Sequence, residues 1–277
     1  MEKEKIRIFQ AQLKVVTDLD AAFAKAEEYC RQATDAGADI LCLPEMWCCP
    51  YEASHFPEYA QPDGGEISSR SAELSAKYGL ILSAGSVPES DGEGRIFNSA
   101  YVFGRNGERL AKHRKMHLFD IDVKGGQRFM ESETLSAGKD VTLFEADGVR
   151  MGLMICYDVR FPELTRLMAL GGAKLVLCPA AFNMTTGPRH WELCHRSEAM
   201  YNQLFVVATS PCLDVENSYH AWGHSIAVDP WGMVIAQLDE KEGVQITELD
   251  LRAVDEAREQ IPLLRQRRTD VYRLEEL

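Results

Sequence analysis

The stretch MGLMICYDVRFPEL places a cysteine, Cys156, directly after an apolar run and follows it at once with polar residues. On this stretch alone, a small buried hydrophobe is the favoured interpretation, because free cysteine is among the most buried residue types. A nucleophilic cysteine instead needs a nearby base or cation to deprotonate its thiol. The chain offers one of each, with Glu45 after the run ILCLP and Lys115 within HRKMHLFD.

These three residues share a predicted position just beyond the carboxyl end of a strand, where functional groups gather in α/β sheets. Together they are chemically complete for acyl transfer. Glu45 would accept the thiol proton while Cys156 attacks a carbonyl carbon, and Lys115 with the backbone N–H of Tyr157 would hold the oxyanion. Glu45 would then protonate the leaving amine and activate water against the thioester.

Each of the three residues also has an ordinary structural explanation. Glu45 fits an acid favoured near a helix N-terminus, and Lys115 fits one solvated member of a basic cluster. Cys156 fits a core position. Because spacing alone does not join positions 45, 115 and 156, the residues by themselves leave both interpretations open.

Composition and charge exclude several classes of protein. The 277 residues are 45% hydrophobic and 26% charged, which is typical of a globular protein. No apolar run approaches the roughly 20 residues needed to cross a bilayer, so we expect no membrane association. The net charge of −13, without a Lys/Arg block, argues against nucleic-acid binding. The N-terminal stretch shows no secretory signal, which predicts a cytoplasmic protein.

Cysteine and histidine usage predicts neither disulfides nor a metal. The eight cysteines form no CxxC pair, and we interpret them as reduced thiols. The pairs His113/His117 and His220/His224 have four-residue spacing, but neither comes with the third ligand of an HExxH-type zinc site. We therefore expect no metal and no cofactor.

Helices and strands alternate along the chain, with hairpins between some of them. Helices are predicted over residues 21–36, 67–78, 162–170, 189–202 and 251–260. Strands are predicted over residues 6–13, 38–43, 80–87, 99–103, 108–113, 141–145, 149–156, 174–177, 204–210, 225–229, 234–238 and 244–249, and residues 120–137 are expected to be irregular. No linker interrupts the pattern, so we expect one mixed α/β domain over residues 1–277, with helices covering two layered sheets.

Three stretches, LCLPEMW, HRKMHLFD and GLMICYDVRFPEL, resemble in that order the three catalytic motifs of the nitrilase superfamily, the carbon-nitrogen hydrolases. The resemblance implies a four-layer α-β-β-α sandwich of two mixed sheets. It also implies that Glu45 is the base, Lys115 the oxyanion-stabilising cation and Cys156 the nucleophile. Glu131, in ESETLSAG, matches a second glutamate that positions the lysine; the alternative is one of two acids in a solvated loop.

Within the superfamily, the segments FNMTTGPRHWEL, KMHLFDID and AWGHS look most like the ω-amidase branch. That resemblance implies hydrolysis of the ω-amide of α-ketoglutaramate and α-ketosuccinamate to the keto acid and ammonia. The carboxylate of such a small-molecule substrate calls for a pocket cation, and Arg160 is the candidate because guanidinium grips carboxylate with two hydrogen bonds. An internal ion pair of Arg160 with Asp158 or Glu163 is the alternative.

The resemblance implies further pocket residues. Tyr157 is assigned to substrate binding, and Phe182 and Thr186 match positions that wall the carbon chain and donate a hydrogen bond; Phe182 as plain core is the alternative. Residues 118–129 would form a loop over the pocket, with Gly125 and Gly126 supplying backbone freedom.

Two departures from the family pattern stand out. Arg189 stands where many relatives have alanine in GPxHWE, which adds a cation near the pocket loop, and Cys48 and Cys49 after Trp47 are unusual.

Other functions stay open from the sequence. Another amidase of the superfamily, such as one acting on deaminated glutathione, would need a pocket for a longer acyl group. A non-catalytic binding protein on the same fold would use Cys156 as a structural or redox-active residue. By analogy with the family, a homodimer or larger homo-oligomer is expected.

Overall fold

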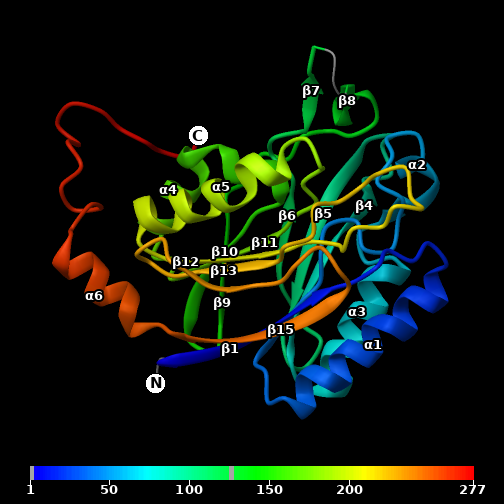
Figure 1. The fold of residues 1–277 in the computed structure, drawn as a ribbon, viewed down its shortest axis with the longest axis horizontal. Coiled ribbons are helices and arrows are strands. Elements are labelled where there is room, and N and C mark those ends of the chain that lie inside the picture. The colour runs from blue at the N-terminus through cyan, green and yellow to red at the C-terminus, as the bar shows by residue number, and fades with distance from the viewer. Residues whose placement is uncertain (1–2, 125–127) are drawn as a thin grey trace.

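Two mixed β-sheets lie face to face between two layers of helices (Figure 1). This computed structural model describes residues 3–124 and 128–277. The first sheet has the order β15 (Gly243–Asp250), β1 (Lys5–Gln12), β2 (Ile40–Cys42), β4 (Ile81–Ser90), β5 (Ile96–Phe103) and β6 (Arg109–Arg114), with β3 (Gln61–Pro62) paired to β4. The second has the order β14 (Val234–Gln237), β13 (Ile226–Val228), β12 (Phe205–Thr209), β11 (Leu175–Pro179), β10 (Val149–Leu153) and β9 (Thr142–Ala146).

The helices form the two outer layers. Those on the first sheet are α1 (Leu19–Asp35) and α3 (Glu66–Tyr78), and those on the second are α4 (Pro162–Leu170) and α5 (Gly187–Asn202) (Figure 1). The short α2 (Phe56–Tyr59) and the peripheral α6 (Arg252–Gln260) complete the set. The predicted four-layer α-β-β-α sandwich is confirmed. No helix within residues 3–124 and 128–277 is long and apolar enough to span a bilayer.

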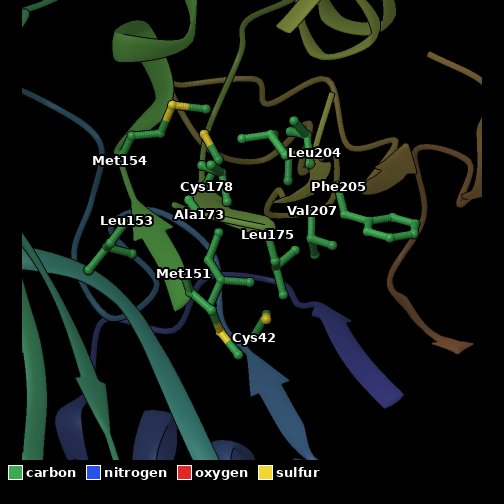
Figure 2. Close-up of a cluster of buried hydrophobic side chains, with 14 of the residues drawn as sticks. Cys42, Met151, Leu153, Met154, Ala173, Leu175, Cys178, Leu204, Phe205 and Val207 are labelled. Carbon is green, nitrogen blue, oxygen red and sulfur yellow. The ribbon is translucent and has the colours of Figure 1, made fainter. Parts of the chain in front are cut away.

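Strand periodicity explains how the first sheet covers two cores. Ile6 and Ile8 of β1 pack into the core between the sheets, whereas Phe9 and Ala11 pack into the core under α1 and α3. This division follows from the two-residue period of a strand, which sends successive side chains to opposite faces. Figure 2 shows the inter-sheet core, where Cys42 of β2 lies among side chains of the second sheet such as Met151.

Parallel crossovers set the positions of the strand ends. The helices α1, α4 and α5 connect the parallel pairs β1–β2, β10–β11 and β11–β12, and α3 lies between the parallel strands β2 and β4. As a result, the carboxyl ends of β2, β10 and β11 carry the segments that begin at Leu43, Met154 and Ala180.

The structure corrects two predicted boundaries. The strand predicted over residues 149–156 ends at Leu153, and Cys156 begins a 3₁₀ turn, η2 (Cys156–Arg160). The segment predicted to be irregular contains the antiparallel pair β7 (Asp120–Asp122) and β8 (Arg128–Met130), followed by the turn η1 (Glu131–Glu133). The predicted lid glycines, Gly125 and Gly126, lie outside the described residues.

Candidate active site

The candidate nucleophile lies on a tight backbone turn. Cys156 has a φ of 47°, in the left-handed region that a non-glycine residue seldom adopts, and its side chain is buried. Such a conformation costs about 1–3 kcal/mol and persists only where surrounding contacts enforce it. Asp158 provides such contacts, because its carboxylate accepts the Ile155 N–H at 3.0 Å and the His117 N–H at 2.9 Å. The Ala181 N–H points at the Cys156 Sγ from 3.5 Å.

Glu45 lies on the loop after β2 and is fully buried. Its Oε1 accepts hydrogen bonds from Asn98 Nδ2 at 2.8 Å and Lys115 Nζ at 3.0 Å, and the Tyr51 hydroxyl lies 3.2 Å away. Its Oε2 has no hydrogen-bond partner among the described residues, and the Cys156 thiol interacts with the carboxyl group of Glu45. The alternative of an acid at the start of a helix is wrong, because Glu45 lies in a turn and the next helix, α2, begins only at Phe56.

The close approach of the Glu45 loop depends on a glycine. Gly85 in β4 has a φ of 62°, and a Cβ built on it would lie 2.1 Å from the Pro44 carbonyl oxygen and 2.9 Å from a Trp47 ring carbon. The next residue, Ser86, donates its N–H to the same Pro44 oxygen at 3.2 Å. Only glycine combines this φ with room for the loop.

Lys115 follows β6 and is also fully buried, so it is not a solvated member of a basic cluster. Its Nζ lies 3.0 Å from Glu45 Oε1, 2.9 Å from both oxygens of Glu131 and 3.3 Å from the Tyr51 hydroxyl. Burial alone would lower the pKa of this ammonium, but the charges of Glu131 and Glu45 raise it overall. Lys115 is therefore a fixed cation.

Glu131 belongs to η1 and is buried beside Lys115 rather than solvated. Its Oε1 accepts the Tyr51 hydroxyl at 2.8 Å, and its Oε2 accepts the Phe119 N–H at 2.7 Å. The neighbouring acid, Glu133, is exposed and pairs with Arg128. Glu131 thus provides a second buried carboxylate, beside that of Glu45, to hold the lysine ammonium.

The electrostatics around the sulfur favour a neutral thiol in the resting site. Burial and the negative charge of Glu45 raise the pKa of Cys156, and Lys115 offsets this only in part. Burial also raises the pKa of Glu45, which makes this carboxylate a stronger base, while Lys115 opposes the shift. We therefore expect the thiol proton to move to Glu45 as the sulfur attacks, rather than a thiolate to be present beforehand.

A small cavity, about 10 Å³ in volume, lies beside the sulfur. Its lining includes all four predicted pocket residues, and the full set is Phe119, Cys156, Tyr157, Arg160, Ala181, Phe182 and Thr186. Arg160 makes no ion pair with any residue in the described ranges, so the predicted alternative of a pair with Asp158 or Glu163 is not formed. Its guanidinium lies 4.5 Å from the Phe182 ring centroid and 5.5 Å from that of Tyr157.

Two pocket residues have additional contacts. Phe182 is buried and packs edge-on against Trp191 with ring centroids 5.1 Å apart, so it belongs both to the core and to the cavity wall. The Thr186 hydroxyl donates its proton to Asn183 Oδ1 at 3.1 Å. Arg189 is exposed and donates to the Thr185 carbonyl oxygen.

The predicted covering segment, residues 118–129, contributes two aromatic rings to the site. Phe119 lines the cavity, and Phe129 stacks on Tyr51 with ring centroids 5.6 Å apart. The unusual Cys48 and Cys49 are both buried away from this cavity.

Three residues of the site were not predicted from the sequence: Tyr51, Asn98 and Asp158. Asn98 had a recognisable signal, since it is an amide within the otherwise apolar strand IFNSAYVF. Asp158 accepts His113 Nε2 at 3.0 Å and His117 Nδ1 at 2.8 Å, so this histidine pair binds a carboxylate. No metal-binding group of three or more His, Cys, Asp or Glu side chains occurs in the described part of the chain.

Comparisons with known proteins agree with this geometry. The family model described as carbon-nitrogen hydrolase matches residues 5–259. The chain belongs to the carbon-nitrogen hydrolase family. It is 48% identical over 246 residues to omega-amidase NIT2 of Xenopus tropicalis, covering 89% of each chain, and 44% identical over 269 residues to omega-amidase NIT2 of Homo sapiens, covering 97% of each. The Nit3 structure of Saccharomyces cerevisiae matches with a TM-score of 0.89 and 36% identity, covering 96% of this chain and 98% of that one. This carbon-nitrogen hydrolase is accordingly an enzyme that acts on carbon-nitrogen bonds other than peptide bonds.

Proposed function

We propose that this enzyme is an ω-amidase, which hydrolyses the ω-amide of short α-keto dicarboxylic acid monoamides to the keto acid and ammonia. The observation that carries the proposal is the burial of Glu45, Lys115 and Cys156 in one cluster beside a small cavity that holds a cation, Arg160. The similarity to omega-amidases over most of the chain supports it.

In the proposed reaction, Cys156 Sγ attacks the amide carbon as its proton passes to Glu45. Lys115 and the Tyr157 N–H hold the resulting oxyanion. The intermediate collapses when Glu45 returns the proton to the nitrogen, which breaks the C–N bond and releases ammonia. Water then attacks the thioester, giving its proton to Glu45, and the acid product leaves as the thiol regains that proton.

The surrounding residues hold this machinery in place. Glu131 and Tyr51 fix the Lys115 ammonium, and Asn98 fixes the Glu45 oxygen that also contacts the lysine. These contacts leave the other Glu45 oxygen for the thiol. We propose that Glu131 acts as a positioning residue rather than as the proton acceptor, because both of its oxygens already accept hydrogen bonds.

The cavity is small and is lined by the Arg160 cation. Its volume of about 10 Å³ is close to the space that one water molecule needs, so its wall must move to admit an acyl group, which favours a short substrate. We propose that Arg160 binds the substrate carboxylate at the end away from the sulfur. Tyr157 and Phe182 would wall the carbon chain, and Thr186 would donate a hydrogen bond after releasing Asn183. Phe119 and Phe129, from the described parts of the predicted covering segment, would lie over the bound substrate.

The test compares α-ketoglutaramate with deaminated glutathione, the longer substrate of a related amidase. We expect kcat/KM to be at least about tenfold higher for α-ketoglutaramate, since one extra group that a small pocket must accommodate typically changes kcat/KM by about that factor. A large preference for deaminated glutathione would assign the enzyme to the other branch. Mass spectrometry of the acid-quenched reaction should show a thioester on Cys156; full turnover by Cys156→Ala would leave only a binding or structural role for that residue.

We further propose a single hydrolase domain over residues 1–277, located in the cytoplasm and assembled as a homodimer or larger homo-oligomer. All eight cysteines are free, which is typical of a reducing compartment. The exposed apolar patch of Leu193, Met200 and Trp231, on α5 and the β13–β14 turn, supports self-association. Its Leu193 is 64% exposed.

A further inference from the structure

Among the described residues, the guanidinium of Arg160 hydrogen-bonds to one side chain, His190 of α5. The Arg160 Nη1 and His190 Nδ1 atoms are 2.9 Å apart. A guanidinium has N–H donors and no acceptor, so His190 Nδ1 must accept this hydrogen bond through its lone pair. His190 is therefore neutral here, with its proton on Nε2.

In the part of the chain that the structure describes, the guanidinium makes no hydrogen bond besides the one to His190. Arg160 Nε is buried and has no hydrogen-bond partner within the described ranges of the chain, and the pair with His190 uses Nη1 alone. An unsatisfied buried donor costs about 1–3 kcal/mol, so a site that retains one is suited to a ligand that supplies an acceptor. The Nε and Nη2 atoms form one edge of the guanidinium, and their two N–H groups match the two oxygens of a carboxylate.

We propose that His190 is a positioning residue that fixes Arg160 through Nη1, so that the Nε/Nη2 edge grips the carboxylate of the substrate side-on. This inference rests on the proposed ω-amidase function and deepens it, because it states which edge of Arg160 recognises the acid. The ring of Phe182 packs against one face of the guanidinium, 4.5 Å from its centre, and limits rotation about the same group.

The surroundings keep His190 in the accepting state. Burial and the positive charges of Arg160 and Arg189 lower the pKa of His190. The first turn of α5 contains no acidic side chain that would compete for Arg160. A neutral acceptor at this position hydrogen-bonds to the guanidinium without neutralising its positive charge. A carboxylate would also form the hydrogen bond, but it would neutralise the charge and so weaken the binding of an anionic substrate.

Two variants separate positioning from simple packing. In His190→Asn, the Oδ1 atom replaces the Nδ1 acceptor, and in His190→Leu the acceptor is lost while much of the volume stays. Each is assayed with α-ketoglutaramate and with 4-oxopentanamide, in which a methyl group replaces the carboxylate. We expect His190→Leu to raise KM for α-ketoglutaramate about tenfold with kcat within about twofold, because uniform binding is lost. His190→Asn should stay within about threefold of the wild-type KM, and kcat/KM for 4-oxopentanamide should be unchanged in both variants.

Arg160→Gln is the reference variant that separates this inference from the proposed function. If Arg160→Gln raises KM for α-ketoglutaramate but His190→Leu does not, the role of His190 is wrong while the function stands. Two other results would also overturn the positioning role of His190, because a loss of packing alone would produce them. One is an equal loss of kcat/KM on both substrates in His190→Leu, and the other is a His190→Asn variant with the same kinetics as His190→Leu. If wild-type protein does not hydrolyse α-ketoglutaramate, the function and this inference both fail.

Discussion

At the scale of single residues, the site depends on one cation shared by two carboxylates. Lys115 contacts both Glu45 and Glu131, and all three side chains are buried. A buried ion pair contributes little net free energy to folding, but removing one partner lowers the stability strongly, because the other charge is left buried and uncompensated. The lysine therefore serves the fold of the site as well as its chemistry.

Replacing Lys115 with alanine should reduce kcat by at least about 10²-fold, because one oxyanion donor is removed. The same change should lower the free energy of unfolding by about 3–5 kcal/mol, since Glu45 and Glu131 are left without their cation. Steady-state kinetics and urea denaturation measure the two effects. Lys139→Ala, at an exposed position, is the control and should match the wild type in both. Turnover near the wild-type rate in Lys115→Ala would contradict the oxyanion role.

The pH dependence should report on Glu45. This carboxyl group must be ionised to accept the thiol proton, and burial raises its pKa above the ordinary value of 4.5. Activity is therefore present above the raised pKa and is lost as the pH falls through it. We expect kcat/KM to decline on the acid side with an apparent pKa above 4.5, while circular dichroism over the same range shows a folded protein. An apparent pKa at or below 4.5 would show that another group controls the acid limb.

At the scale of elements, the sequence predicts the order of helices and strands better than the residues at which they end. The order of helices and strands follows from hydrophobic periodicity, and the segments carrying Glu45 and Cys156 fall at the carboxyl ends of β2 and β10 as expected. The apolar run before Cys156 predicts strand up to the cysteine, but Met154 and Ile155 form a short irregular segment between β10 and η2. Apolar composition does not distinguish a buried irregular segment from a buried strand.

Contacts between elements explain what the sequence could not reveal about the site. Tyr51 reaches Glu45 and Glu131 only because the chain folds back after β2, and nothing local marks this tyrosine. The sequence suggests Asp158 only as a partner for Arg160, yet its carboxylate binds His113, in strand β6 of the other sheet, and the His117 N–H, in the segment after β6. Such pairings depend on sheet packing, which a linear pattern does not encode.

Gly85→Ala should move the loop that carries Glu45. A Cβ at this position would lie 2.1 Å from the Pro44 oxygen, so the loop must shift in addition to the strain of the positive φ. We expect a clear loss of kcat and a drop in unfolding free energy larger than the roughly 1–3 kcal/mol of backbone strain alone. Gly92→Ala is the matched control, because Gly92 has a φ of 78° and no atom within 4 Å of its ideal Cβ. If the two variants lose the same stability and both keep full kcat, the close approach does not position Glu45.

At the scale of the whole molecule, the site lies where the two sheets meet. Glu45, Asn98 and Lys115 come from the first sheet and its connections, whereas Cys156 and Ala181 follow strands of the second. The inter-sheet core shown in Figure 2 therefore sets the distance between base and nucleophile. The helices on the outer faces have no part in the acid-base chemistry, which leaves the α5 surface available for association between copies.

Leu193→Glu should therefore convert the assembly to a monomer without unfolding it. Leu193 is 64% exposed, so a charged side chain there is compatible with the monomer, but a glutamate from each copy would be buried in an interface formed by the patch of Leu193, Met200 and Trp231. Light scattering at matched concentration should give a mass near twice 31.1 kDa or larger for the wild type and near 31.1 kDa for the variant. Val215→Glu, at a residue that is 73% exposed and outside the patch, should assemble like the wild type. A monomeric wild type would remove the basis for self-association, and a variant that still assembles would place the interface on another face.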